Sequence, residues 1–345
     1  MASQRDVKNR IGSVKNIQKI TRAMEMVAAA RLRRAEERIS ALRPYARALR
    51  QMTRQAALDA GAETARLALL NDRDETNTIG LLLVTGDRGL AGAFNSQVIR
   101  AGVRAGNEIQ EQGRQSAWYA TGRRGVSSLT FRGYELSGAY TGFTDKPSYS
   151  DARVIAGELI EAYTSGAVDR VDIVYNSYVS PLTQEVARET LLPLSRATIE
   201  GEEAQDAGEA AGEHRSGSVS GSASGPRSGS VSGSASGSRT ASVSGSRSPS
   251  APGHPDDGPK ALVEYEPDAE EILSQLVPDY VETSIYRALV ESAAGFFGAQ
   301  MTAMRNASEN AGEIITDLTL EMNRARQAEI TQEIMEVVAG AEGLS

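Results

Sequence analysis

Hydrophobic residues recur at helical spacing along the first part of the chain. They lie mainly three or four positions apart: Val7, Ile11, Val14, Ile17, Ile20, Met24, Val27, Leu32, Ile39 and Leu42. This spacing predicts one amphipathic helix over about the first 55 residues. The first proline is Pro44, where we expect a kink or a weak joint. At 1.5 Å per residue the helix is about 75 Å long, more than the width of a small domain.

The C-terminal part has the same character. Beyond Pro278, apolar or small residues keep a heptad alternation: Phe297, Met301, Met304, Ser308, Ala311, Ile315, Leu318, Met322, Ala325 and, after a slip in phase, Ile330, Ile334, Val337 and Ala341. This predicts a second helix over 279–341, roughly 95 Å long if unbroken, with local weak points at Gly295, Gly298 and Gly312. Two such helices with matched apolar seams favour an antiparallel coiled coil.

Between the two helices, short apolar runs alternate with amphipathic segments. We expect helices at 90–112 and 149–165, and strands at 78–84, 116–120, 170–180 and 183–192, the last two paired. Residues 126–136 carry no assigned element. Strands that alternate with helices indicate a Rossmann-like α/β domain with a mostly parallel sheet and right-handed crossovers.

A low-complexity segment follows this domain. Residues 200–213 are acidic and rich in Ala and Gly, residues 216–250 contain 16 Ser and 7 Gly, and SGSVSGSASG occurs twice. Such a composition buries too little apolar surface to offset its ordering entropy, which predicts a disordered insert. The predicted organisation is therefore a coiled-coil helix at 1–60, an α/β domain at 75–199, the insert at 200–259, a connector at 260–278 and a coiled-coil helix at 279–345.

Composition removes several chemistries. The chain has no Cys, and its two histidines, His214 and His254, lie in the low-complexity segment. Thiolate or histidine zinc sites, disulfides and a Ser-His-Asp triad are therefore excluded from the predicted folded part. No apolar run approaches the roughly 20 residues of a membrane span, and the polar N-terminus leaves no room for a signal peptide. We expect an intracellular chain without direct membrane insertion.

Charge is distributed unevenly along the chain. Residues 1–54 hold 14 Lys and Arg against 4 Asp and Glu, a net of +10, although the whole chain carries -8. A basic segment on an acidic body indicates an electrostatic partner, either nucleic acid or an acidic protein surface, or else a solvated helix face. Nucleic-acid binding is the weaker alternative, because residues 1–54 contain one Tyr and neither Trp nor Phe for base stacking.

A glycine-rich segment, TGDRGLAG at 85–92, follows a predicted strand and opens a predicted helix. Nucleotide-binding folds place phosphate loops at this position, so a nucleotide-dependent enzyme is one alternative. The glycine spacing is G-x-x-G-x-x-G, however, and none of the five lysines of the chain lies in the segment. The competing interpretation is a tight turn in which Asp87 and Arg88 make contacts between segments or subunits.

Three segments resemble the gamma subunit of F-type ATP synthase. They are RIGSVKNIQKITRAMEMVAA at 10–29, TGDRGLAGAFN at 85–95 and NRARQAEITQEIMEVVAGA at 323–341, and they occur in the order of that family. Ala91 stands where many members have Cys, Met322 stands where Tyr is frequent, and the Ser/Gly insert is not a general family feature.

The resemblance implies a rotor shaft with no catalytic residue, cofactor or metal site of its own. It implies a coiled coil inside the alpha3beta3 ring of F1 and a base that meets the epsilon subunit and the c-ring, peripherally, at the cytoplasmic face of the cell membrane. Rotation of the shaft would couple ion flow to ATP synthesis or hydrolysis. The resemblance places Arg326, Gln327 and Thr331 against the catch loops of beta and Met24 against its lever segment. Arg88, in the glycine-rich turn, completes the predicted partner contacts.

Overall fold

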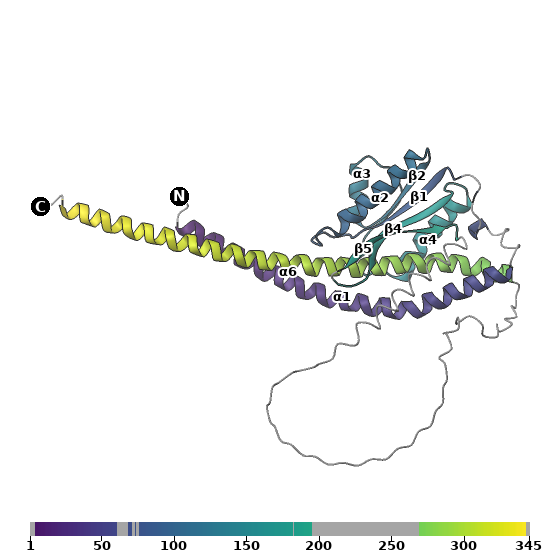
Figure 1. The fold of residues 1–345 in the computed structure, drawn as a ribbon, viewed down its shortest axis with the longest axis horizontal. Coiled ribbons are helices and arrows are strands. Elements are labelled where there is room, and N and C mark those ends of the chain that lie inside the picture. Colours follow the sequence, from purple (N-terminus) through teal and green to yellow (C-terminus); the bar gives the residue numbers. More distant parts are fainter. Residues whose placement is uncertain are drawn as a thin grey trace, which may run out of the picture. The chain divides into compact units, whose positions relative to one another are not determined.

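The computed structural model describes residues 4–60, 68–70, 73, 76–181, 183–194 and 269–342. They form two long helices, α1 (Gln4–Ala60) and α6 (Ala269–Glu342), a short 3-10 helix η2 (Ala68–Leu70) and a sheet with three further helices (Figure 1). The insert at 200–259 lies outside the described residues, and its disorder stays a prediction.

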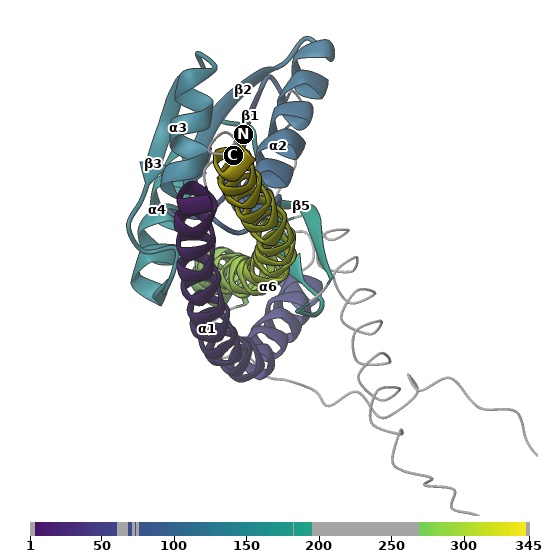
Figure 2. The same ribbon diagram turned by 90° about the vertical axis from the view of Figure 1, so that its left-hand side faces the viewer.

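Helices α1 and α6 run side by side in opposite directions (Figures 1 and 2). Ile11, near the start of α1, packs with Leu318 of α6. Further along α1, Glu25 forms an ion pair with Arg305, whose Nε lies 2.9 Å from the carboxylate. Residue numbers thus rise along α1 while those of its neighbours on α6 fall. The predicted antiparallel coiled coil is confirmed.

The seam of α1 differs in part from the predicted one. Val7, Ile11, Leu32 and Ile39 are buried as expected. Ile17, Ile20 and Val27 were expected there too, but they are 53%, 59% and 52% exposed. On this stretch of α1 the buried residues are instead Thr21 and Ala28, which form the seam. The prediction for these three residues is wrong because apolar side chains cover two faces of α1, of which only one meets α6.

Both long helices continue through the positions where a kink or weak points were expected. α6 begins at Ala269, before the predicted start at 279, and passes through Pro278 and all three glycines of the predicted weak points. α1 continues through Pro44. Packing explains the early start of α6, since Leu273 and Val277 share one face of its first turns and are both buried.

The sheet has five strands in the order β3-β2-β1-β4-β5. They are β1 (Thr78–Val84), β2 (Gln115–Thr121), β3 (Leu136–Tyr140), β4 (Arg170–Tyr178) and β5 (Gln184–Leu192). β1 pairs in parallel with β2 and β4, β2 pairs in parallel with β3, and β4 pairs antiparallel with β5. The mostly parallel sheet and the pairing of its last two strands are confirmed.

Three helices accompany the sheet: α2 (Phe94–Glu111), α3 (Arg123–Phe131) and α4 (Tyr149–Thr164). Part of α3 and the start of β3 occupy 126–136, where the sequence pattern assigned nothing.

The sheet is covered on both faces. On one face Leu81 and Leu83 of β1 pack with residues of α2 and α3. On the other face Leu82 packs with α4 and with Val281 and Ile285 of α6. α6 is therefore both one half of the helix pair and a layer of the α/β domain, which joins the two parts into one packed unit.

Candidate functional site: the exposed shaft and its junction with the sheet domain

The C-terminal end of α6 extends past the start of α1 (Figure 1). Every residue from 326 to 339, the tip of α6, is exposed. The predicted contact residues Arg326, Gln327 and Thr331 all lie on this tip. Gln327 and Thr331 are one helical turn apart, and the Thr331 hydroxyl donates to the carbonyl of Gln327 at 2.8 Å. The structure thus brings three of the five predicted residues onto one exposed segment.

Large apolar side chains are also exposed along the shaft. On the tip these are Ile330, Ile334, Met335, Val337 and Val338, with exposed fractions from 48% to 72%. On the first half of α1 they are Ile17, Ile20, Met26 and Val27, with fractions from 52% to 64%. Rows of exposed large apolar residues mark surfaces that another protein covers. These two rows form the shaft surface.

Met24 lies apart from the tip. It is half-buried on α1 beside Glu25, whose partner is Arg305. At 1.5 Å per residue, Arg305 and Arg326 are about 30 Å apart along α6. Met24 lies next to Glu25 and so at the level of Arg305. Met24 and the tip residues are therefore two separate contact positions on the shaft.

The glycine-rich turn uses its own hydrogen-bonding groups internally. The Asp87 carboxylate accepts from the backbone N–H of Arg123 and Gly142, each at 3.0 Å, and from the hydroxyl of Thr144 at 2.8 Å. Arg123 is the first residue of α3, so the carboxylate lies at the N-terminal end of α3 and joins the turn to a helix other than α2, which follows the turn. The N–H of Gly86 donates to the side chain of Asn95 at 2.8 Å. This geometry supports the tight turn and not the phosphate loop.

Hydrogen bonding also sets the protonation of Asp87. Burial alone would raise the pKa of its carboxyl, but hydrogen bonds from Gly142, Thr144 and Arg123 stabilise the charged form, and the pKa falls below its usual value. Asp87 is thus a carboxylate at neutral pH that holds three segments together.

Arg88 connects the same turn to α1. Its Nε lies 3.3 Å from Oδ2 of Asp145, and Arg31 of α1 places Nη1 3.5 Å from the same oxygen. Arg88 therefore makes a contact between segments of its own chain. Its side chain is still 66% exposed, and its contact with a partner stays a prediction.

The shaft and the sheet domain meet at an apolar cluster that sequence reasoning did not identify. This junction gathers residues of α1, α2, β4 and α6, namely Leu32, Ala35, Ile39, Phe94, Tyr178, Val290, Ala294, Phe296 and Phe297. The Tyr178 hydroxyl also donates to the Glu36 carboxylate at 2.5 Å. Burial and this carboxylate raise the pKa of Tyr178, which keeps the phenol protonated as a donor. The only signal in the sequence was the apolar spacing within each helix.

A long antiparallel helix pair with an uncovered end, fixed to a mostly parallel α/β domain, defines a shaft-type subunit of a larger assembly. A profile of the family described as ATP synthase matches residues 3–344. The chain belongs to the ATP synthase gamma chain family. It is therefore the non-catalytic rotor-shaft subunit of an ATP synthase, and the expectation from the three sequence segments is confirmed.

Relatives match over their full length. The ATP synthase gamma chain of Rubrobacter xylanophilus is 39% identical, with 100% of this chain and 99% of that one covered. That of Streptomyces coelicolor is 37% identical, with 100% and 97% covered. Neither the nucleotide-dependent enzyme nor the nucleic-acid binder receives support from these relatives.

Solved structures show the same fold. A chain of the central stalk and c-ring structure of the Tetrahymena thermophila mitochondrial ATP synthase aligns with a TM-score of 0.52 at 20% identity, covering 84% of this chain and 99% of that one. A chain of the Euglena gracilis mitochondrial ATP synthase aligns with a TM-score of 0.57 at 14% identity, covering 99% and 94%. Within the described ranges, no helix has an apolar stretch long enough to cross a membrane.

Proposed function

We propose that the tip of α6 turns inside a ring of alternating alpha and beta subunits of F1, while the sheet domain faces the epsilon subunit and the c-ring at the cytoplasmic face of the membrane. One observation carries this proposal. The tip exposes a continuous run of residues, 326–339, that includes five large apolar side chains. Such a helix end needs a surrounding protein to cover it.

The junction explains how rotation at the base reaches the tip. The buried contacts of α6 with the sheet, and the apolar cluster that Leu32 and Ile39 of α1 share with Phe297, hold the shaft and the domain together. A base turned by ion flow therefore turns the shaft as one body. Because different sides of the shaft carry different side chains, its rotation changes which contacts each catalytic site meets, and rigid-body motion couples the sites.

The charge of α1 supports acidic partner segments on the ring. Residues 1–54 carry a net of +10. Complementary charge steers association and fixes register more than it adds affinity. We assign Arg326, Gln327 and Thr331 to the catch loops of beta, and Met24 to its lever segment.

The assignment of the tip residues is tested in the assembled complex. Arg326 and Gln327 can donate several hydrogen bonds to a carboxylate-bearing loop. We expect Arg326→Ala plus Gln327→Ala to lower the ATP turnover of the complex severalfold. Arg104→Ala plus Gln110→Ala, which removes the same residue types from the exposed side of α2, is the matched control. Unchanged turnover of the tip variant, in a complex verified to contain all subunits, would disprove these contacts.

A further inference from the structure

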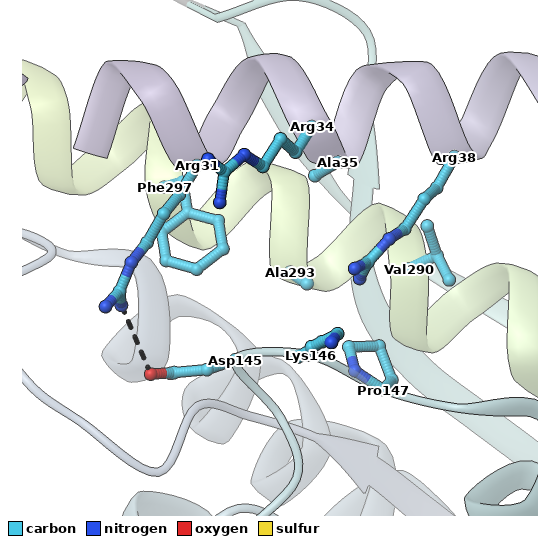
Figure 3. A pocket seen from close by; sticks show the side chains of 10 residues that line it. All are labelled: Arg31, Arg34, Ala35, Arg38, Asp145, Lys146, Pro147, Val290, Ala293 and Phe297. Atoms are coloured by element: carbon cyan, nitrogen blue, oxygen red, sulfur yellow. Dashed lines mark ion pairs between the residues drawn. The ribbon is translucent and has the colours of Figure 1, made fainter. Parts of the chain in front are cut away.

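A basic pocket lies where α1, α6 and the loop between β3 and α4 meet. Its volume is about 240 Å³. Arg31, Arg34 and Arg38 line it from α1, and Asp145 and Lys146 line it from the loop; Figure 3 shows Arg31 and Arg38 extending from α1 toward that loop. The remaining wall is apolar and consists of Ala35, Pro147, Val290, Ala293 and Phe297.

The single carboxylate of the lining is already occupied. Asp145 pairs with Arg31 at 3.5 Å and with Arg88 at 3.3 Å through the same oxygen. The Arg31 guanidinium also lies 5.7 Å from the centre of the Phe297 ring, a cation–π contact that orients it at the pocket wall. Asp145 therefore does not neutralise the other cations of the pocket.

Among the residues that the structure describes, three cations of the pocket have no counter-ion. Arg34, Arg38 and Lys146 have no ion-pair partner in the parts of the chain that the structure describes. Arg34 and Arg38 are four residues apart on α1 and share one helix face, an arrangement in which like charges repel. Arg34 and Lys146 are exposed and Arg38 is half-buried, so water reaches these cations, and an anion held between them would relieve their repulsion.

We propose that this pocket binds a compact dianionic phosphate group. Guanidinium forks match phosphate oxygens in pairs, while the Lys146 ammonium supplies a mobile third donor from the opposite side. The volume accommodates a phosphate group with its first water molecules, and the group could belong to inorganic phosphate or to the end of a nucleotide. The apolar wall formed by Phe297 lowers the local dielectric beside the bound group and so strengthens its ion pairs.

A bound phosphate would connect the shaft to the sheet domain. Arg34 and Arg38 belong to α1, whereas Lys146 belongs to the loop that leads into α4. One anion between them would add a bridge across the junction, next to the ion pair of Arg31 with Asp145. The inference concerns the isolated chain and does not depend on which subunits surround the tip.

The test is titration of the full-length chain with sodium phosphate at constant ionic strength, followed by calorimetry and phosphorus-31 NMR. We expect saturable binding that Arg34→Gln plus Arg38→Gln weakens at least about tenfold, since two charge-assisted hydrogen-bond donors are lost. Arg22→Gln plus Arg47→Gln removes two exposed arginines of the same helix outside the pocket and is expected to bind like the unaltered chain. Lys146→Gln tests the site from the loop, without a change in α1.

Further titrations distinguish the possible ligands. ADP that competes with phosphate and binds more tightly would indicate a nucleotide phosphate, and equal or weaker ADP binding would indicate free phosphate. Equal phosphate affinity in all variants, or no saturable binding by the folded wild-type chain, would overturn the proposal. A glutamate-rich peptide that binds through Arg34 and Arg38 where phosphate does not would also overturn it, in favour of a protein partner.

Discussion

Asp87 shows how much depends on a single side chain of the glycine-rich turn. Its carboxylate joins the start of α3 to Gly142 and Thr144. Asp87→Asn keeps the shape but removes the charge and part of the acceptor capacity. We expect the free energy of unfolding at pH 7 to fall by about 2 kcal/mol. This loss is smaller than the summed contributions of the hydrogen bonds to Asp87, because the carboxylate is partly exposed to solvent. Urea denaturation of the isolated chain measures it, with exposed Asp317→Asn as the control.

The same substitution has a pH signature. The pKa of Asp87 is lowered in the folded chain, so its contribution to stability is complete above the ordinary carboxyl pKa of about 3.9 and declines as the pH falls through the lower folded value. The difference in unfolding free energy between wild type and Asp87→Asn should therefore shrink in acid. A difference that stays constant from pH 7 down to pH 3 would contradict the role given to this carboxylate.

At the scale of residues, the sequence predicted which side chains make contacts better than it predicted where those contacts lie. Arg88 and Asp87 were expected to make contacts from the turn, and they do, within the chain. The pocket was not predicted, because Arg34 and Lys146 are far apart in sequence and only the fold brings them together. The net charge of residues 1–54 was the one available signal, and it does not say where on α1 the cations converge.

Among the elements, two helical glycines give opposite predictions. A Cβ at Gly12 of α1 meets nothing within 4 Å, whereas one at Gly106 of α2 would lie 2.4 Å from Cζ2 of Trp118. Gly12→Ala should stabilise the isolated chain by up to about 1 kcal/mol through helix propensity. Gly106→Ala has the same propensity gain, but the clash outweighs it, and we expect a net loss of about 1–3 kcal/mol. Thermal unfolding of the two variants side by side tests this, and destabilisation of both would refute the assignment of open space at Gly12.

The elements with strong patterns were the ones predicted well. β1 buries six of its seven residues, and the apolar run was visible in the sequence. α3 was missed because it is short and polar, with Gly125 and Leu129 as its buried residues and Phe131 exposed by 92%. The seam of α1 was partly misplaced for the opposite reason. Its sequence has more apolar positions than α6 alone can cover, and periodicity does not tell which partner covers each face.

For the whole molecule, the insert provides the clearest test. Residues 201–259 are predicted from composition to contribute no packed core. Deletion of this stretch should leave assembly with the other subunits and ATP hydrolysis largely unchanged. The measurement is the ATP turnover of the purified complex that carries the deletion. The complex with Arg326→Ala plus Gln327→Ala is measured in parallel, because it shows how far turnover falls when a contact is damaged. Failure of the deleted chain to assemble would show that the insert has a structural role.

The uncovered tip of α6 has a mechanical consequence. From Val7 to the junction the shaft is two helices thick, but over 326–339 it is one. A single helix bends and twists more readily than a packed pair, so under load the deformation concentrates in the tip. The section of the shaft that we propose to meet the ring is thus more compliant than the paired section, and it could hold elastic energy between steps while the paired section turns as a stiff rod.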